Sequence, residues 1–304
     1  MTSSSTRLSP TEITRQAVDS FAATPDARSR EILQSLVTHL HAFVTDVGLT
    51  EREWADAVAV LTATGHITDD RRQEFVLWSD TLGVSMLVDA LAHPSPGGAT
   101  ESTILGPFYV PGSPLREHGA DIAEQEAGTP AWIRGRVRSL DGTPIAGAEL
   151  DVWQNGDNEL YAVQDPDAPD DHLRGRFLTD DDGGFSFRAV RPVPYRIPDD
   201  GPVGRMLAAT GRHPWRPAHI HVVVRAAGHA TLTTHLFDAE SHHLHDDTVF
   251  AVKPTLVHSF AARAADDPAR PPGIEESWVE LEIDLVLAPS DHPADPFVDG
   301  GRTH

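Results

Sequence analysis

The chain has 304 residues, a formal net charge of −22, no cysteine and a hydrophobic fraction of 39%. This length favours about two globular domains. The acidic charge argues against nucleic acid or an anionic membrane surface as a partner, because both attract basic proteins. The lack of cysteine excludes disulfides, thiolate nucleophiles, zinc ribbons and iron–sulfur clusters. A bound metal would therefore need His, Tyr, Asp or Glu as ligands. No apolar run reaches the roughly 20 residues of a membrane-spanning helix, and the first ten residues lack the apolar segment of a signal peptide. We expect no membrane insertion and a cytoplasmic location.

The first third of the chain predicts helices. Ser9, followed by proline and then by Glu12, has the form of a capping box, and Thr50 with Glu53 forms a second one. Between them, apolar residues recur at helical spacing over 32–43.

A further helix is predicted over 72–91. On a helical wheel Asp80 falls near the centre of its apolar stripe, whereas Asp89 falls on the opposite face. A buried carboxylate is costly without a partner, so Asp80 indicates either an ion pair or cap, or a binding function.

The proline- and glycine-rich run 93–98 ends the helical pattern, and apolar residues then alternate with a period of two. This alternation predicts strands at 132–137, 150–153, 185–187, 219–223, 232–236 and 279–287. Short strands separated by Gly/Pro turns are typical of a β-sandwich or barrel. We therefore predict an α+β protein with a helical domain over 1–98, an all-β sandwich catalytic domain over 99–290 and a polar tail over 291–304.

The run 216–221 (RPAHIH) carries the first sign of chemistry. His219 and His221 alternate along a strand and so present two imidazoles on one face. Such a pair is also common in ordinary packing, and the pattern alone leaves that structural role open. Arg216 would place a fixed cation beside the pair, where it could attract an anionic ligand or stabilise developing negative charge.

Two of the three tyrosines, Tyr161 and Tyr195, lie upstream of this run. A phenol has an ordinary pKa of about 10 and becomes a good ligand only when a strongly charged cation removes its proton. Two phenolates with two imidazoles suit ferric iron better than Zn²⁺ or Mg²⁺. Four protein ligands leave a position open for substrate.

Several ordered blocks resemble the intradiol ring-cleaving dioxygenases of the catechol 1,2-dioxygenase superfamily, over most of the chain. The blocks are TILGPFY (103–109), GRV (135–137), DGTPIAGA (141–148), DVWQ (151–154), RPVPY (191–195) and RPAHIH (216–221). The resemblance implies an Fe(III) enzyme in which Tyr161 and His219 are equatorial ligands, and Tyr195 and His221 axial ones. It further implies that the diol binds the iron as a dianion, that Tyr195 leaves the metal and acts as a base, and that Arg216 stabilises the negatively charged ring. No external reductant is needed.

The segment 77–90 (LWSDTLGVSMLVDA) resembles most the hydroxyquinol 1,2-dioxygenase branch. In that branch the residues at the positions of Leu77 and Asp80 face the ring, and Asp80 would hold the third hydroxyl of hydroxyquinol (benzene-1,2,4-triol). Cleavage would give 3-hydroxy-cis,cis-muconate or maleylacetate in aromatic catabolism. The resemblance also assigns to the substrate pocket Arg216, Ile104, Leu105, Gly106, Pro107, Phe108, Ile197, Pro198 and Val249.

Two other functions stay open at this point. One is a catechol or chlorocatechol 1,2-dioxygenase that gives cis,cis-muconates, and the other is a metal-free β-sandwich binding module. His235 stands where many catechol-cleaving relatives have glutamine, which favours the hydroxyquinol branch and leaves the role of His235 open. The resemblance implies a homodimer built through the N-terminal helices, with a lipid bound between them in some members. The run 241–247 (SHHLHDD) fits no strand or helix face and is interpreted as a solvated loop rather than a second metal site.

Overall fold

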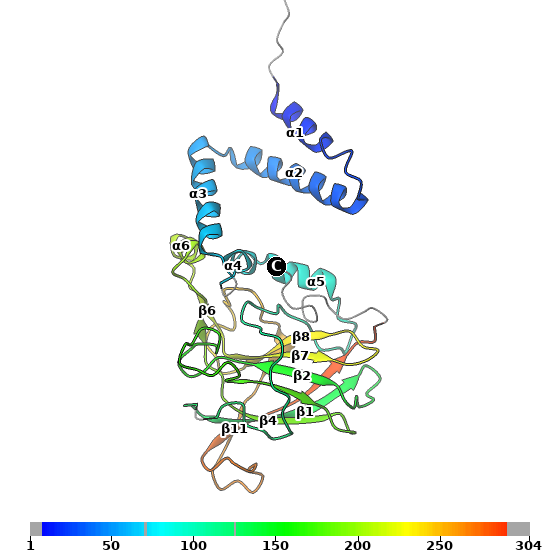
Figure 1. Ribbon diagram of the computed structural model, residues 1–304, viewed down its shortest axis with the longest axis vertical. Helices are drawn as coiled ribbons and strands as arrows, with labels where there is room; N and C mark the ends of the chain where they lie inside the picture. Colours follow the sequence, from blue (N-terminus) through cyan, green and yellow to red (C-terminus); the bar gives the residue numbers. More distant parts are fainter. Residues whose placement is uncertain (1–7, 70–71, 125, 291–304) are drawn as a thin grey trace, which may run out of the picture. The chain divides into compact units, whose positions relative to one another are not determined.

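The computed structural model describes residues 8–69, 72–124 and 126–290 (Figure 1). The predicted tail over 291–304 thus lies outside the described residues. The chain divides into two compact units, residues 1–63 and residues 64–304. The predicted domain boundary at residue 98 stays a prediction.

The first unit is helical and begins with α1 (Pro10–Asp19) and α2 (Ala27–Val47), followed by most of α3 (Glu51–Ile67). The capping box at Thr50 is complete, because the Glu53 N–H donates to Thr50 Oγ1 at 3.3 Å and the Thr50 N–H donates to a Glu53 carboxylate oxygen at 2.9 Å. At α1 only half of the predicted box forms. The Ser9 hydroxyl accepts from the Glu12 N–H, but the Glu12 carboxylate pairs with Arg15 instead.

Large apolar side chains remain exposed on this helical unit. No residue of α1 or α2 is buried. Four side chains at helical spacing on α2 are between 51% and 57% exposed: Ile32, Leu36, Leu40 and Phe43. An apolar stripe of this kind normally covers a core or a partner.

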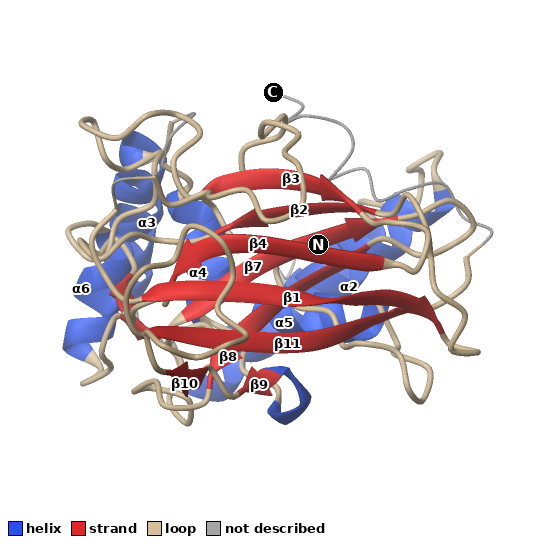
Figure 2. Ribbon diagram, turned by 90° about the horizontal axis from the view of Figure 1, so that it is seen from below, coloured by secondary structure: helices blue, strands red, loops and turns tan. Residues whose placement is uncertain are grey.

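The second unit contains a sandwich of two β-sheets (Figure 2). The first sheet has the order β10 (Ala261–Arg263), β11 (Trp278–Leu287), β1 (Pro130–Ser139) and β4 (Gly184–Val190). The second has the order β3 (Arg174–Leu178), β2 (Glu149–Trp153), β7 (His219–Arg225), β8 (Leu232–Asp238) and β9 (Val257–His258). A short ribbon pairs β5 (Tyr195–Arg196) with β6 (Trp215–Arg216). All six predicted strands are present, which confirms the β-rich part of the fold. Four of the five unpredicted strands have only two or three residues, and the five residues of β3 (RGRFL) show no apolar alternation.

Strand β7 is buried on both faces. Its alternate residues Ile220, Val222 and Val224 belong to the core between the two sheets, while Val223 packs in a second apolar cluster with Trp153. His219 and His221 share the face of Val223 because side chains alternate along a strand. The two histidines therefore point away from the sandwich core.

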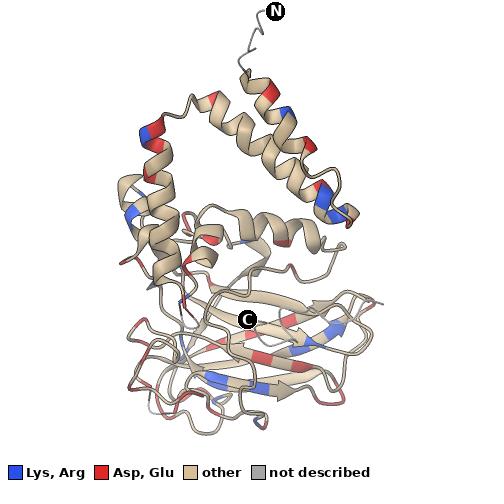
Figure 3. Ribbon diagram, turned by 45° about the horizontal axis from the view of Figure 1, so that its top comes forward, with Lys and Arg blue, Asp and Glu red and all other residues tan. Residues whose placement is uncertain are grey.

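On the outer surface of the first sheet, arginines of β1 form ion pairs with acidic residues of β11. Arg134 contacts Glu280 at 2.8 Å and Glu282 at 2.7 Å, and Arg138 contacts Asp284 at 2.9 Å. Figure 3 shows acidic and basic segments on adjacent strands of the sandwich. The Glu282 and Asp284 carboxylates are exposed, so these two pairs contribute at most about 1 kcal/mol each, whereas Glu280 is buried.

The helix predicted over 72–91 is wrong as a single element. It is two helices, α4 (Glu74–Thr81) and α5 (Val84–Ala92), bent by 75° at Gly83, which has a left-handed φ of 74°. Both Asp80 and Asp89 are buried, whereas Leu87 and Leu91, which a single straight helix would place in the same apolar stripe as Asp80, are 61% and 75% exposed. The wheel failed because the glycine ends one helix and starts the next in a different direction.

The helices of this unit lie on the side of the β7 and β8 sheet, away from β1, β4 and β11 (Figures 1 and 2). Helix α6 (Pro202–Ala209) was not predicted from the sequence. Its start is fixed by α4, since the Val203 N–H donates to the Glu74 carboxylate at 3.0 Å. In the described part of the chain no single helix is long and apolar enough to cross a membrane, and α4 with α5 meets the length and composition only as a bent pair.

Candidate metal centre

Four side chains predicted as ligands meet on the outer face of β7. His219 and His221 come from β7, Tyr195 from β5 and Tyr161 from the loop after β2. None of the four is more than 2% exposed. The antiparallel pairing of β5 with β6 sets Tyr195 opposite Arg216 and so delivers the arginine to the same place.

The donor atoms of these residues converge. His221 Nε2 lies 3.0 Å from the Tyr161 hydroxyl and 3.1 Å from His219 Nε2. Arg216 Nη1 lies 3.2 Å from the Tyr195 hydroxyl and 3.3 Å from His219 Nε2. His219 Nδ1 donates to the Pro217 carbonyl at 2.7 Å, which leaves the lone pair on Nε2 free to face the centre. Two oxygens and two nitrogens around one point suit a metal ion.

Burial sets the charge of these groups. It lowers the pKa of His219 and of His221 well below the usual value, so both imidazoles are neutral and able to ligate. Burial also raises the pKa of Tyr161 well above 10, an effect that the Tyr195 phenol reinforces and Arg216 partly offsets. Tyr161 thus stays a neutral phenol unless a stronger cation displaces its proton, which a bound trivalent metal does.

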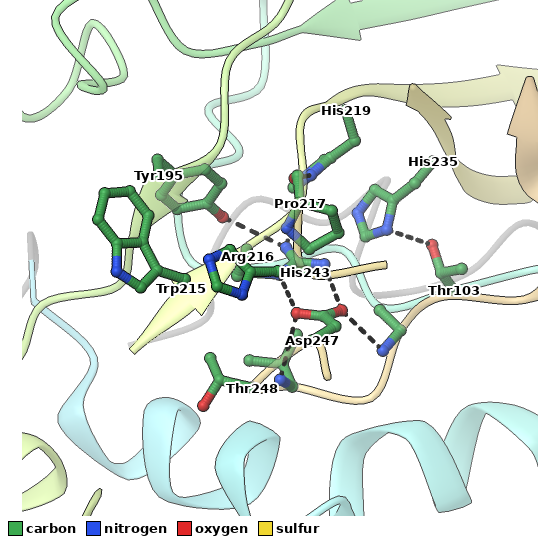
Figure 4. A network of polar contacts seen from close by, with 12 residues as sticks. Thr103, Tyr195, Trp215, Arg216, Pro217, His219, His235, His243, Asp247 and Thr248 are labelled. Carbon is green, nitrogen blue, oxygen red and sulfur yellow. Dashed lines mark hydrogen bonds and ion pairs between the residues drawn. The ribbon is translucent and has the colours of Figure 1, made fainter. Parts of the chain in front are cut away.

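Arg216 forms an ion pair with Asp247, a residue that was not predicted from the sequence. Burial opposes the charge of the arginine, but the Asp247 carboxylate together with Tyr195 and Tyr161 outweighs this effect and raises the pKa of Arg216. The Nε atom contacts Asp247 at 3.2 Å, and Asp247 itself accepts the Val249 and Ala251 N–H groups at 3.3 and 3.0 Å (Figure 4). The guanidinium is therefore fixed in charge and orientation beside the Tyr195 hydroxyl.

Asp247 closes the run 241–247, which was interpreted as a solvated loop. The segment is a loop with His242, His245 and Asp246 exposed, but Asp247 is 5% exposed, so that interpretation is wrong at its last residue. Its two adjacent aspartates gave no signal that one of them turns inward.

The same loop forms a second cluster of polar groups. The Asp246 carboxylate faces His213 Nε2 at 3.0 Å and His243 Nδ1 at 3.2 Å. His213 Nδ1 accepts the Trp215 N–H, so its proton lies on Nε2 and serves the carboxylate rather than a metal.

His235 also lies near the centre, yet it is not placed as a ligand. Its Nε2 faces His221 Nδ1 at 2.8 Å, and its Nδ1 faces the Thr103 hydroxyl at 3.1 Å. Both ring nitrogens are thus engaged. Burial, with His221, His219 and Arg216 nearby, lowers the pKa of His235 well below its usual value, so the ring is neutral.

The structure brings most of the predicted pocket residues around the centre. Leu77, Leu105, Phe108 and Ile197 pack in one apolar cluster with Tyr161 and Tyr195, while Ile104 and Val249 belong to the adjoining cluster that contains Phe237. A side chain at Gly106 would lie 3.4 Å from the His221 ring, so this glycine allows the loop to approach closely. The assignment of Pro107 and Pro198 to the pocket stays a prediction.

Asp80 reaches this region from α4. Its side chain is 2% exposed. Burial raises the pKa of Asp80, a hydrogen bond with Ser85 and attraction to Arg216 oppose the rise, and repulsion from Asp247 adds to it. Of the residues that the structure describes, none forms an ion pair with Asp80. The carboxylate predicted on a distant helix therefore lies within electrostatic reach of Arg216.

Comparisons with known proteins agree with this architecture. A dioxygenase family model matches residues 104–289, and a model for the catechol dioxygenase N terminus matches residues 26–100. The chain belongs to the intradiol ring-cleavage dioxygenases, a family of enzymes. Membership in this family implies a non-haem iron cofactor. This membership separates it from metal-free binding modules.

Within this family the chain is similar to hydroxyquinol 1,2-dioxygenases. It is 46% identical to that of Nocardioides simplex, covering 92% of this chain and 95% of the relative, and 47% identical to that of Rhodococcus opacus, covering 90% and 91%. The solved hydroxyquinol 1,2-dioxygenase from Pseudomonas putida DLL-E4 superposes with a TM-score of 0.87 at 46% identity, covering 92% of this chain and 99% of that one. A catechol 1,2-dioxygenase from Pseudomonas arvilla C-1 gives 0.81 at 30% identity, covering 92% of each chain.

Proposed function

We propose that this enzyme cleaves hydroxyquinol between its two adjacent hydroxylated carbons with O₂, to give 3-hydroxy-cis,cis-muconate or maleylacetate. Both oxygen atoms enter the product, so no reductant is required. The similarity to hydroxyquinol 1,2-dioxygenases supports this substrate class. The observation that carries the choice of substrate is the buried Asp80 carboxylate, which has no ion-pair partner among the described residues and lies within reach of Arg216.

We further propose that Tyr161, Tyr195, His219 and His221 hold Fe(III). The fit rests on the donor set, since two buried phenols and two neutral imidazoles converge and suit a trivalent ion. When bound, the ferric ion supplies Lewis acidity that takes up the diol and activates its ring toward O₂.

Side chains of the protein supply the remaining functions: proton transfer, stabilisation of negative charge and binding of the ring. Tyr195 would hold the iron as a phenolate, and its oxygen, 3.2 Å from Arg216 Nη1, is positioned to take a proton from the substrate as a general base. Arg216 keeps its charge through Asp247 and stabilises the negative charge that develops on the ring. Leu77, Phe108 and Ile197 supply apolar contact for the ring.

Asp80 gives the discrimination between substrates. Hydroxyquinol would add a hydrogen bond from its third hydroxyl to the one that Asp80 has with Ser85, whereas catechol would leave only the latter. The missing hydrogen bond is costly because the carboxylate is buried. The site thus favours the triol over the diol.

We also propose a homodimer built through the N-terminal helices, with a lipid held between them. The exposed apolar residues of α2 support an apolar partner. The cytoplasmic location stays a prediction.

The test is oxygen uptake with hydroxyquinol and with catechol, on protein whose iron has been quantified. We expect faster turnover of hydroxyquinol. Asp80→Asn should lower kcat/KM for hydroxyquinol about tenfold, since a charge-assisted hydrogen bond becomes a neutral one, and should leave catechol nearly unchanged.

Asp89→Asn is the matched control, because Asp89 is also a buried carboxylate but is paired with Lys253 at 3.3 Å. It should not alter the ratio of the two substrates. An equal loss for both substrates in Asp80→Asn would show that Asp80 does not select the substrate. Faster cleavage of catechol by the unaltered enzyme would favour a catechol 1,2-dioxygenase instead.

A further inference from the structure

A second histidine lies directly behind one of the candidate metal ligands. The antiparallel register of β7 with β8 places His235 opposite His221. The two rings are nearly perpendicular, at 82°, with their centroids 4.3 Å apart, and His235 Nε2 lies 2.8 Å from His221 Nδ1. His235 is fully buried, so water does not compete for this contact.

The far side of His235 is also fixed. Its Nδ1 lies 3.1 Å from the Thr103 hydroxyl, which is 3% exposed (Figure 4). Thr103 is itself anchored to β8, because its backbone N–H donates to the Thr233 carbonyl at 2.8 Å. The loop that carries Thr103 and the strand that carries His235 are therefore held together by a backbone hydrogen bond as well as by the side-chain contact.

His221, His235 and Thr103 form a row of hydrogen-bonded side chains. The positions of their protons follow from the role of His221 as a metal ligand. A neutral His221 that ligates through Nε2 carries its proton on Nδ1 and donates it to the atom 2.8 Å away, His235 Nε2. His235 Nε2 must then be the acceptor, so the His235 proton lies on Nδ1 and is donated to the Thr103 hydroxyl. Each nitrogen in the row has one role, with no conflict between neighbours.

The other contacts of the His221 ring lie on its faces or on the metal side. Trp153 stacks on one face of the ring, with centroids 4.6 Å apart, and Gly106 approaches Cε1. The Tyr161 hydroxyl and His219 Nε2 lie near Nε2, where the metal would bind. On the Nδ1 side, the hydrogen bond to His235 is the contact that the structure describes.

We infer that His235, held by Thr103, is a positioning residue that fixes the proton and the ring orientation of His221 and thereby strengthens metal binding at this centre. The inference rests on the proposed function, in that His221 is taken to hold the iron. Hydrogen-bond partners of metal-ligating histidines commonly change metal affinity by 10–100-fold when removed.

The variants that test this role differ in hydrogen bonding but little in volume. His235→Leu removes both contacts. His235→Gln keeps an acceptor for His221 and a donor for Thr103 on one amide, and Thr103→Val removes only the last contact of the row. Thr234→Val is the matched control, because Thr234 is buried on the same strand but bonds the Glu101 carbonyl instead.

The readouts are the iron affinity, measured by competition with a chelator, and the visible charge-transfer absorption of the iron-loaded protein. We expect about 10–100-fold weaker iron binding and a shifted absorption band in His235→Leu, and a smaller loss in Thr103→Val. His235→Gln should stay within a few-fold of the unaltered enzyme, and Thr234→Val should match it.

Two failures are distinguishable. If the unaltered enzyme itself binds no iron, the proposed metal centre is wrong. If it binds iron, and His235→Leu retains iron with the same affinity and absorption, the positioning role alone is overturned. Should His235→Leu fail to fold, Thr103→Val decides the matter, and unchanged iron affinity in that variant overturns the inference.

Discussion

Arg216 shows how one buried charge can organise several reacting groups. It contacts the Tyr195 hydroxyl, His219 Nε2 and the Asp247 carboxylate, and it attracts Asp80 from α4. A buried cation is stable only when such partners compensate for its lost hydration. The charge that keeps Arg216 in place is thus provided by residues far from it in the sequence.

Asp80 should reduce the stability of the iron-free protein at neutral pH. Burial raises its pKa above the ordinary 3.8, so the folded state binds more protons than the unfolded state in the interval above that value. Stability contributed by the protonated group is present below pH 3.8 and is lost as pH rises through the folded-state pKa. The thermal midpoint of Asp80→Asn, compared with that of the unaltered protein, should therefore become relatively higher from pH 4 to pH 8.

Asp165→Asn gives a control of opposite sign. The pKa of Asp165 is lowered by hydrogen bonds from the Asp167 N–H and the Asn158 amide, so its carboxylate stabilises the fold above the ordinary pKa. Asp165→Asn should become relatively less stable as pH rises. A fall in the relative stability of Asp80→Asn over the same range would instead identify Asp80 as a structural ion-pair or capping residue.

At the scale of elements, Gly83 explains where periodicity was informative and where it was not. The apolar spacing of 72–91 correctly indicated helix, but it could not show that a left-handed residue at Gly83 redirects the second half. Asp89 consequently turned inward to Lys253, and Leu87 and Leu91 of α5 turned outward. Asp80 lies before the bend, so its predicted burial was confirmed despite the wrong helix.

Gly135 in β1 is the element-level position least able to accept a side chain. A Cβ atom there would lie 1.6 Å from the Ile283 carbonyl oxygen of the parallel neighbour β11. Since that oxygen belongs to the backbone, Gly135→Ala must separate the two strands, and we expect a loss of about 3 kcal/mol in the free energy of unfolding. Denaturant unfolding measures this loss.

Gly65→Ala is the control for the substitution itself. Gly65 lies in α3 with nothing within 4 Å of the added atom, so alanine should stabilise the helix by roughly 0.5–1 kcal/mol. A Gly135→Ala protein as stable as the unaltered one would mean that β1 and β11 do not pair as closely as described.

For the whole molecule, features that depend on residue type and local spacing could be predicted from the sequence, whereas contacts between distant segments could not. The two histidines of β7 were predicted on one face because strand alternation is local, and the two tyrosines were proposed as ligands from their chemistry and the family resemblance. Asp247 and the contact of Thr103 with His235 were not predicted, because each depends on the way distant segments come together. A local sequence pattern does not show which distant segments will be in contact.

The last prediction concerns the proposed homodimer and involves substitutions in the first unit only. The central part of α2, residues 32–45, carries no lysine, arginine, aspartate or glutamate (Figure 3), and its Leu36 and Leu40 are more than half exposed. Burying two carboxylates in an apolar interface is unfavourable, so Leu36→Glu with Leu40→Glu should weaken dimerisation at least about 100-fold, which corresponds to roughly 2.8 kcal/mol. Sedimentation equilibrium measures the change. Thr38→Glu adds a carboxylate on a different face of α2 and should leave the dimer intact. If the double variant keeps the dimer of the unaltered protein, α2 does not form the interface, and its apolar stripe must be covered in another way.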